Sequence, residues 1–548
     1  MSSNKNYSIV ESLKEFSKEN KATLGMYTFL SLAFPINDVL LPYYYGKIID
    51  SASKSDPSNI WKNTRRNIII VIIFWAIKQL FTYKLDALDA EFLPKLKSHI
   101  RTDVVVRILE AYKENYRDPE IGKLLVYIMD LPWLIGALFK QIRYFVLPIF
   151  PVLFFVFIFF FSVNPSLGLL FVLLAAAYFS LIYVYYNSCS SVSSTRERIH
   201  TELSEDVADL LSNMLNVYSA DTIEEELKKF EKGQCVYDRI CTKEIHCSSK
   251  FKIMFNALYM LIFLSINGYA FYLYSQKKIT LASLSSVLIV SLYLVNLLEK
   301  SSREMRDFAT CWAIVKMTQG YINDLGEIPT QKESFKKKLN GSILIKNYKV
   351  RDISIPYLRI EPQERVAFVG KTGVGKSSLI NSIMKLTPYE GEIYVDNENT
   401  DNMNAQDLRR QIMYIPQESR LFNRSVFDNI KYGNENVTKE DVVKVLKNLN
   451  ITQITEKDLD RLAGKNGNQL SGGQKQIVYF MRFLFRDASI VILDEPTSGL
   501  DENTRNQILN ILYLIIQGKT MIIISHDKDV PNHFENIRII DIEQYNTD

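Results

Sequence analysis

A glycine-rich segment in the second half of the chain has the spacing of a loop that binds phosphate. The letters "GKTGVGKS" run from Gly370 to Ser377 and match the pattern G-x-x-x-x-G-K-[ST], directly after the apolar run "RVAFVG". Backbone N–H groups from Gly373 to Ser377 can surround a β-phosphate at the start of a helix. The Lys376 ammonium can neutralise the β- and γ-phosphates, and the Ser377 hydroxyl can ligate Mg²⁺. The pattern predicts ATP and Mg²⁺ as cofactors. The residues predicted to contact nucleotide in this loop are Gly370, Lys371, Thr372, Gly373, Val374, Gly375, Lys376, Ser377 and Ser378.

Two further apolar runs end in polar residues that suit phosphate chemistry. "SIVILDEP" (489–496) is typical of a central parallel strand and ends in Asp494 and Glu495. Because ligands bind at the carboxyl edge of such sheets, Asp494 is predicted to hold Mg²⁺ and Glu495 to polarise the attacking water. "TMIIISHD" (520–527) brings His526 to the same edge, where it is predicted to contact the γ-phosphate. Two solvated acids and a structural histidine are the alternatives, which the phosphate loop in the same domain disfavours.

A second glycine pair raises the question of why one domain has two phosphate-binding elements. It lies in "NQLSGGQKQIVYF" (468–480), at the predicted start of a helix with Ser471 as its cap. A helix N-terminus with two glycines presents free N–H donors to a phosphate. The loop at 370–378 already serves one nucleotide, so these residues alone leave the role of the second element open.

The first 320 residues, by contrast, have the composition of a membrane region. Six apolar stretches each approach the ~20 residues that a helix needs to cross a bilayer core of ~30 Å. They lack the polar faces of a large buried helical core, which is the alternative. Two polar segments, 84–123 and 189–250, keep helical periodicity and are predicted to extend the spans as helices into water. The predicted spans are 22–45, 68–83, 145–163, 167–186, 253–274 and 281–298.

Changes in composition divide the chain into four predicted parts. They are an N-terminal interfacial helix at 1–21, a six-helix transmembrane domain at 22–317, a linker at 318–340 and a nucleotide-binding domain at 341–548. In the first part, Ile9, Leu13 and Phe16 share one helical face, as in helices of the membrane interface. Basic residues in the long polar segments predict that these segments and both termini lie on the cytoplasmic-type side. Acidic residues near the N-terminus disfavour a mitochondrial presequence.

Charge and cysteine content limit the partners and the redox chemistry. The formal net charge is +4 over 548 residues, which does not indicate a nucleic-acid partner. The five cysteines include no Cys-x-x-Cys pair, and Cys235, Cys241 and Cys247 point to different faces if they share a helix. The sequence predicts unpaired thiols in a reducing compartment, without a disulfide or a metal site built from cysteine.

Taken in order, the motifs resemble those of an ATP-binding cassette (ABC) transporter of the exporter type. "GKTGVGKS", "YIPQES", "LSGGQ", "VILDEP", "SGLD" and "ISHD" follow one another as in that family's cassette, and the resemblance covers almost the whole chain. It implies a six-span α-helical membrane domain with long cytoplasmic helical extensions, followed by an α/β P-loop ATP-binding cassette. The implied activity is ATP hydrolysis coupled to transport across a membrane.

The resemblance also implies roles for individual residues. Gln417 is similar to the glutamine that links Mg²⁺ and water to the membrane domain, Asp501 to the aspartate at the dimer seam, and His526 to the switch histidine. In this family two cassettes pack head to tail, so "LSGGQ" of one faces the γ-phosphate held by Lys376 of the other. The residues implied to act in this way are Ser471, Gly472, Gly473 and Gln474. One cassette with six spans is half a transporter in a lipid bilayer, as a homodimer or, alternatively, a heterodimer.

The base site and the substrate follow less directly from the resemblance. Tyr348, 22 residues before Gly370, is the candidate for stacking on adenine, in a segment shorter than in the family. "REMRDFATC" (303–311) resembles mitochondrial transporters that export glutathione-linked sulfur compounds, and lipid and peptide or drug exporters are alternatives. An ATP-gated regulatory subunit and a soluble ABC ATPase are the other classes. The location is open between a mitochondrial-type inner membrane and a plasma membrane.

Overall fold

In the computed structural model, the packing of the chain divides it into two compact units. The helical unit contains Met1–Leu109 and Asp118–Glu327, and the cassette unit contains Glu110–Arg117 and Ile328–Asp548. A short segment from within the predicted membrane region therefore packs with the cassette. The structure describes residues 8–53, 55, 57–116, 121–324, 332, 334–335, 337–350, 353–371, 373–417, 420–496, 502–525, 534 and 536–545.

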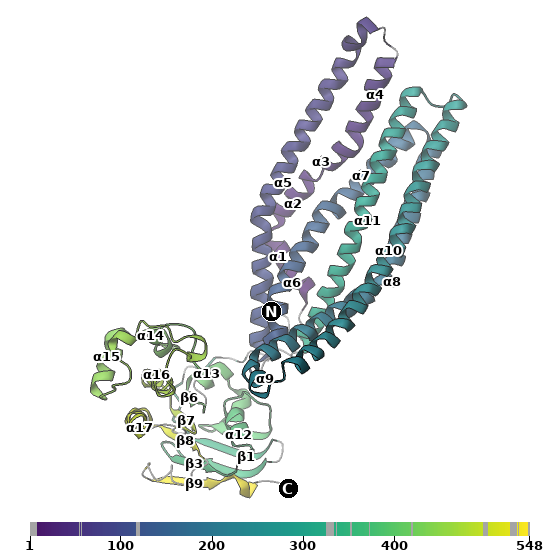
Figure 1. Ribbon diagram of the computed structural model, residues 1–548. Helices are drawn as coiled ribbons and strands as arrows, with labels where there is room; N and C mark the ends of the chain where they lie inside the picture. The colour runs from purple at the N-terminus through teal and green to yellow at the C-terminus, as the bar shows by residue number, and fades with distance from the viewer. Residues whose placement is uncertain are drawn as a thin grey trace. The chain divides into compact units, whose positions relative to one another are not determined.

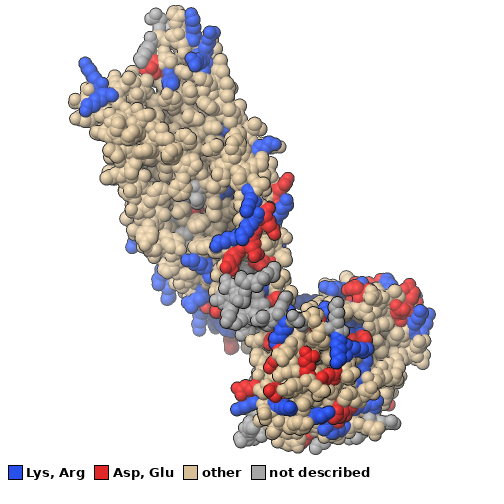
Figure 2. Space-filling view, turned by 180° about the vertical axis from the view of Figure 1, so that it is seen from behind, with Lys and Arg blue, Asp and Glu red and all other residues tan. Residues whose placement is uncertain are grey.

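Long helices make up the helical unit (Figure 1). Within the described residues, six helical stretches are long and apolar enough to cross a membrane, which confirms the six predicted spans and their helical extensions. These stretches are Lys21–Ser53, Ile60–Ala111, Leu124–Val163, Pro165–Ser212, Ile223–Ser275 and Leu281–Asp324. Figure 2 shows a broad, largely uncharged face on this unit, with charged side chains gathered towards its ends. The chain is therefore an integral multi-pass membrane protein.

Turns of π-helix interrupt two of the spans. They are η1 (Ile36–Leu40) in the first span and η3 (Ile142–Val146) in the third. A 3-10 turn, η2 (Pro57–Asn59), precedes α5. Between α7 and α8, the Asn164 side chain accepts a hydrogen bond from the Ser166 N–H and a proline follows it, so this link starts the next helix. The α-helices are α1 (Ile9–Glu19), α2 (Lys21–Leu30), α3 (Ala33–Pro35), α4 (Leu41–Ser53), α5 (Ile60–Ala111), α6 (Ile121–Gln141), α7 (Leu147–Val163), α8 (Pro165–Ser212), α9 (Met214–Ala220), α10 (Ile223–Ser275) and α11 (Leu281–Asp324).

The first and last helices of the helical unit, α1 and α11, differ from what composition predicts. Helix α1 buries Ile9 and Phe16, and the Phe16 ring centre lies 5.3 Å from that of Phe92 on α5. The apolar face of α1 is thus covered by protein within this unit. Helix α11 continues to Asp324, so the first part of the predicted linker at 318–340 is helical.

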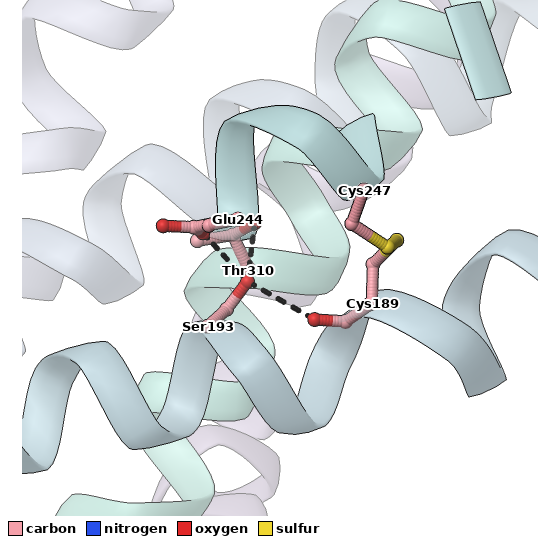
Figure 3. Close-up of a disulfide and its surroundings, with 5 residues drawn as sticks. All are labelled: Cys189, Ser193, Glu244, Cys247 and Thr310. Carbon is pink, nitrogen blue, oxygen red and sulfur yellow. Dashed lines mark hydrogen bonds between the residues drawn. A yellow bond between two sulfur atoms is a disulfide. The ribbon is translucent and has the colours of Figure 1, made fainter. Parts of the chain in front are cut away.

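A disulfide joins Cys189 on α8 to Cys247 on α10 (Figure 3). Their Cα atoms are 6.0 Å apart, although 58 residues separate them in sequence. The prediction of unpaired thiols is therefore wrong for this pair, whereas Cys235, Cys241 and Cys311 are free. The spacing of cysteines along α10 could not reveal a partner on another helix, because only the hairpin of α8 and α10 brings the two together.

Polar contacts reinforce the junction one turn away from the disulfide. The Ser193 hydroxyl on α8 donates to Glu244 Oε1 on α10 at 2.7 Å and lies 3.5 Å from the Thr310 hydroxyl on α11 (Figure 3). Arg196 Nη1 forms an ion pair with Glu244 Oε2 at 3.0 Å. Side-chain contacts around Ser193 therefore connect α8, α10 and α11.

The described part of the cassette unit contains two sheets. A five-stranded parallel sheet has the order β6-β7-β8-β3-β9, and a four-stranded antiparallel sheet has the order β2-β1-β4-β5. Strands β7 and β8 are buried along their whole length, because α16 and α17 cover one face and α12 with the antiparallel sheet covers the other. The predicted α/β architecture is thereby confirmed.

The strand and helix bounds of the cassette unit place its motifs at strand ends and helix starts. The strands are β1 (Ile343–Val350), β2 (Ile353–Ile360), β3 (Arg365–Val369), β4 (Glu390–Val395), β5 (Glu398–Asn399), β6 (Ile412–Ile415), β7 (Ile490–Asp494), β8 (Thr520–Ile524) and β9 (Ile537–Asp541). The α-helices are α12 (Lys376–Ile383), α13 (Ala405–Arg410), α14 (Val426–Ile430), α15 (Lys439–Asn448), α16 (Gly472–Leu484) and α17 (Glu502–Ile516). Shorter 3-10 turns are η4 (Thr400–Asn402), η5 (Glu456–Asp458), η6 (Lys465–Gly467) and η8 (Ile542–Tyr545).

Candidate nucleotide site

The glycine loop lies between β3 and α12, in the strand–loop–helix setting that its pattern predicts. Gly373 and Gly375 adopt left-handed backbone conformations, with φ of 86° and 95°. A Cβ atom at Gly375 would lie 2.6 Å from Ile353 Cδ1, so a larger residue would also have to displace that side chain. Left-handed turns at a helix start are the geometry that gathers N–H groups around an anion.

The Lys376 ammonium lies inside this loop. Its Nζ donates to the backbone carbonyls of Gly370 at 2.6 Å and Lys371 at 2.8 Å, and only 5% of the residue is exposed. Burial lowers the pKa of Lys376, while the nearby carboxylates of Glu495 and Asp494 act in the opposite direction. A phosphate in the loop would offer this ammonium charged acceptors, which bind it more strongly than carbonyls.

The predicted metal ligands meet at the carboxyl end of β7. Ser377 Oγ donates to Asp494 Oδ2 at 3.5 Å, and the Tyr414 hydroxyl donates to the same oxygen at 3.2 Å. Burial raises the pKa of Asp494, and the two hydrogen bonds oppose that shift. Mg²⁺ is commonly bound by one or two protein oxygens together with nucleotide phosphates. The hydroxyl and carboxylate present here therefore fit Mg²⁺.

Glu495 and Gln417 form a second contact at this edge of the sheet. Gln417 Nε2 donates to Glu495 Oε2 at 2.8 Å. Glu495 has a left-handed φ of 47°, and its N–H donates to the Ile524 carbonyl at the end of β8. This backbone turn brings the carboxylate next to the glutamine amide. The structure thus brings together the two residues predicted to orient and activate water.

The "LSGGQ" segment begins α16 with a capping box. Ser471 Oγ accepts from the Gln474 N–H at 3.2 Å, and Gln474 Oε1 accepts from the Ser471 N–H at 3.1 Å. Gly472 and Gly473, the first two helical residues, have N–H groups without an acceptor inside the helix. A Cβ atom at Gly473 would lie 2.8 Å from Gln453 Oε1 and 2.9 Å from Thr504 Cγ2, so a larger residue there would have to displace both side chains. The helix start can therefore offer two donors to an anion.

Tyr348 is not placed to stack on a base, which corrects the prediction for this residue. Its side chain is fully buried in the core of the cassette unit, and its hydroxyl lies 3.1 Å from that of Ser382. Burial raises the pKa of Tyr348 to about 12. An irregularity at Asn347, which has a φ of 48°, shifts the register of β1 against β4 and breaks its alternation, so that the ring of Tyr348 enters the core. The residue against the glycine loop is the aliphatic Ile353.

The other predicted site residues fall into two groups. Val374 packs against the core of the cassette unit, and Ser378 lies in the first turn of α12. Thr372, Asp501 and His526 lie outside the described residues, so their roles stay predictions.

Residues for which the sequence predicts no role also contribute to the site. Glu543, in η8, accepts a hydrogen bond from the Lys371 N–H at 2.6 Å, and the Gln453 carbonyl accepts one from Gln474 Nε2 at 2.9 Å. Tyr414 is the third, through its hydrogen bond to the Asp494 carboxylate. No sequence signal points to Glu543 or Gln453, because strand order and loop packing place them. For Tyr414 the signal is weak: it is the first residue of "YIPQES", but its position in that motif does not indicate a contact with Asp494.

A cavity of about 730 Å³ opens on the cassette unit beside β6. Its lining includes Arg409, Arg410, Arg482, Arg486, Tyr414, Tyr432 and Tyr479. The Arg482 guanidinium donates to the Asn429 carbonyl at 2.8 Å and lies 4.7 Å from the centre of the Tyr479 ring. We call this feature the arginine-lined cavity. Backbone carbonyls and aromatic rings contact several of its guanidinium groups without neutralising their charge, and Asp487 is the one acidic residue in its described lining.

Segment 110–117 packs against the rest of the cassette unit. Arg409 Nη1 donates to the Lys113 carbonyl at 2.7 Å. Lys385 Nζ lies 3.8 Å from Glu114 Oε2, and the lysine side chain is only 6% exposed. The segment that follows α5 is therefore held by specific contacts with cassette residues.

Comparison with known proteins finds matches for both parts of the chain. The family model described as "ABC transporter transmembrane region" matches residues 24–298, about half of the chain, and that described as "ABC transporter" matches residues 354–498. An ATP-dependent lipid A-core flippase of Hahella chejuensis is 38% identical over 34% of this chain and 32% of its own length. The "ABC transporter ATM1" of Plasmodium falciparum is 36% identical over 32% of this chain and 17% of its own length. The chain thus spans about a third or less of the length of these curated relatives.

A solved structure is similar over nearly the whole chain. It is the structure of a bacterial Atm1-family ABC exporter with ATP bound, with a TM-score of 0.84 and 19% sequence identity. The similarity covers 96% of this chain and 93% of that one. The solved structure shows that the chain shares the fold of an ABC exporter, and the two family matches show that the protein belongs to the ABC transporter family, with a membrane region and a cassette on one chain.

Proposed function

We propose that this protein exports a substrate across a membrane as a dimer of half-transporters driven by ATP hydrolysis. The observation that carries the proposal is the meeting of two residue pairs beside the glycine loop: Ser377 with Asp494, and Gln417 with Glu495. They supply the metal ligands and the water-activating groups of one ATPase site. Fusion of this site to six candidate spans favours transport over the activity of a soluble ATPase.

Each part of this edge has a role in the proposed hydrolysis. Lys376 and the loop N–H groups bind the β- and γ-phosphates, and Ser377 with Asp494 hold Mg²⁺. The bound Mg²⁺ supplies positive charge to the phosphate oxygens. Glu495 accepts a hydrogen bond from the attacking water, and the Gln417 amide fixes the direction of the Glu495 carboxylate.

The start of α16 serves the partner subunit's nucleotide in this proposal. The N–H groups of Gly472 and Gly473 have no acceptor within their helix, and the helix dipole adds positive potential at the same place. In a homodimer they would face the γ-phosphate bound by the other subunit. ATP then joins two cassettes, and hydrolysis releases them. A helix start that binds the partner's nucleotide would explain why one domain has a second phosphate-binding element.

The α9 helix is proposed to couple the two subunits. None of its residues is buried: Leu215 is 79% exposed and Tyr218 is 59% exposed. The next helix begins with Glu224 and Glu225 in its first turn. An apolar and acidic surface of this kind complements the arginine-lined cavity. We therefore place α9 of one subunit against that cavity in the other.

For the substrate we propose a glutathione-linked sulfur compound. Support comes from the segment "REMRDFATC" (303–311) and from the similarity to the Plasmodium protein named ABC transporter ATM1. A lipid is the second candidate, because two similar bacterial proteins are named lipid A-core flippases.

Uptake into proteoliposomes tests the function and the substrate together. Protein reconstituted with cassettes outward should accumulate labelled glutathione conjugates when ATP and Mg²⁺ are added, and the Glu495→Gln variant should not. The same vesicles are then offered labelled lipid and peptide. Movement of lipid alone would select the second candidate. An ATPase that moves none of the three classes, and is stimulated by none, would contradict export.

A further inference from the structure

Tyr414 connects two strands of the parallel sheet at the metal-binding edge. Strand β6 pairs with β7 so that Tyr414 lies opposite Ile492. Asp494 is two residues further along β7 and so shares a sheet face with Ile492. The phenol hydroxyl can thus reach forward to Asp494 Oδ2, at 3.2 Å. Ser377 Oγ approaches the same oxygen from α12, at 3.5 Å.

The ring of Tyr414 is held on the side away from Asp494. It packs against the core of the cassette unit and forms part of the wall of the arginine-lined cavity, beside Tyr479 and Arg482. A ring fixed in this way cannot follow a mobile carboxylate, so the carboxylate must settle where the hydroxyl is. A neutral phenol has one hydrogen to donate, and an ionised carboxylate can only accept it.

We propose that Tyr414 is a positioning residue that holds the Asp494 carboxylate ready for Mg²⁺. The proposal rests on the proposed ATPase site and gives a role in it to the first residue of "YIPQES", for which the motif itself indicates none. Hydrogen-bond donors behind a ligating carboxylate fix its orientation before the metal arrives. Without the hydroxyl, Asp494 would keep only the longer hydrogen bond from Ser377, and binding of Mg²⁺ would have to complete its ordering.

A purely structural role is the competing explanation. In that case the Tyr414–Asp494 bond only ties β6 to β7, and its loss would weaken the fold and all nucleotide binding alike. A positioning role predicts a selective effect: binding of ATP with Mg²⁺ is weakened, and binding of ATP without Mg²⁺ is not. The two roles therefore differ in a measurement that needs no catalysis.

The test is a pair of binding curves for a fluorescent ATP analogue, one with Mg²⁺ and one with a chelator. Full-length protein carrying Glu495→Gln is the parent, so that hydrolysis does not disturb the measurement. Adding Tyr414→Phe keeps the ring and removes the hydroxyl. We expect the concentration of Mg²⁺ needed for half-maximal tightening to rise about tenfold. Binding in the chelator should be unchanged.

A matched control is Tyr389→Phe in the same unit. Tyr389 also has its hydroxyl bonded, to Thr400 at 2.8 Å, but that pair is part of no proposed metal site. Its removal should leave both curves unchanged. Equal weakening of both curves by Tyr414→Phe, or no change in the Mg²⁺ requirement, would overturn the assignment. A parent protein whose ATP binding ignores Mg²⁺ would overturn the proposed ATPase site itself, and the assignment with it.

Discussion

At the scale of the residue, the position of Glu495 depends on an uncommon backbone conformation. A left-handed φ is unfavourable for a side chain such as glutamate, by about 1–2 kcal/mol. The hydrogen bond from the Glu495 N–H to the Ile524 carbonyl and that from Gln417 to the carboxylate hold it there. Strain of this kind, kept by specific contacts, is common at catalytic positions.

The first prediction concerns that carboxylate. Glu495→Gln keeps the shape of the side chain and removes the charge that polarises water, so ATP should still bind while turnover falls by about 10²–10⁴-fold. Binding of labelled ATP and release of phosphate, measured on the same preparation, check this. Glu398→Gln, on an exposed strand position of the same unit, should leave both unchanged. Turnover that survives the Glu495 change would remove its catalytic assignment.

The second prediction follows from the burial of Tyr348. Tyr348→Leu should lower the free energy of unfolding by about 2 kcal/mol, because a buried ring is lost from the core. The affinity for ATP should stay the same, since the ring is not available to a base. Denaturant unfolding and a nucleotide titration measure the two effects. Weakened ATP binding in a protein that is still folded would restore the stacking role to Tyr348.

The motifs predict the residues that act on phosphate, but they do not predict the contacts that position those residues. Ser377 and Asp494 are far apart in sequence, yet one follows the glycine loop at a helix start and the other ends a strand, and these positions predict that the two meet. Tyr414 acts on Asp494 through the register of β6 and β7, which sequence alone does not determine. Tyr348 failed for the same reason: distance along the chain from the glycine loop says nothing about which face of β1 its ring occupies.

At the scale of the element, the long hairpin of α8 and α10 decides which side chains meet. Apolar composition was enough to predict both helices as spans with extensions, because each is long and each has a clear apolar run. The pairing of Cys189 with Cys247 depends on how the two helices align, and composition does not contain that information. The disulfide lies beside the Ser193–Glu244 hydrogen bond, so a covalent bond and a hydrogen bond connect α8 to α10 at neighbouring positions.

The third prediction is a count of reactive thiols. Alkylation of the denatured protein without reduction should label three cysteines, which are Cys235, Cys241 and Cys311, and five after reduction. Mass spectrometry of the intact chain reads the number directly. In Cys189→Ser, all four remaining cysteines should react without reduction, because Cys247 loses its partner. Labelling of five thiols in the unreduced wild-type chain would show that the bridge is not formed.

At the scale of the whole molecule, one chain supplies one glycine loop and one "LSGGQ" helix start. If the glycine loop and the helix start serve different nucleotides, two chains together complete two sites. A substitution in the loop or in the helix start then affects one identifiable site of the dimer. Ser471 caps the start of α16, which the proposed dimer would offer to the partner, whereas Lys376 lies in the glycine loop, which each chain would keep for its own nucleotide.

The fourth prediction uses that division. Ser471→Arg and Lys376→Ala should each abolish ATP hydrolysis in a homodimer. In a mixed dimer both lesions fall on one composite site and the other is intact. Mixing the two variants should restore roughly a quarter of wild-type hydrolysis, since half of random dimers are mixed and each keeps one of two sites. If mixed dimers form but hydrolyse no ATP, the prediction fails. Either the "LSGGQ" segment then serves its own subunit's ATP, or hydrolysis at one site requires hydrolysis at the other.

Residues 110–116 belong to the cassette unit, although they come from the half of the sequence that contains the spans. They begin in the last turn of α5, and Lys113 and Glu114 contact Arg409 and Lys385 of the cassette unit. The Tyr116 N–H also donates to the Leu386 carbonyl at 2.6 Å. A cassette separated from the first half of the chain would therefore lose part of its own packing, including the ion-pair partner of the buried Lys385 ammonium.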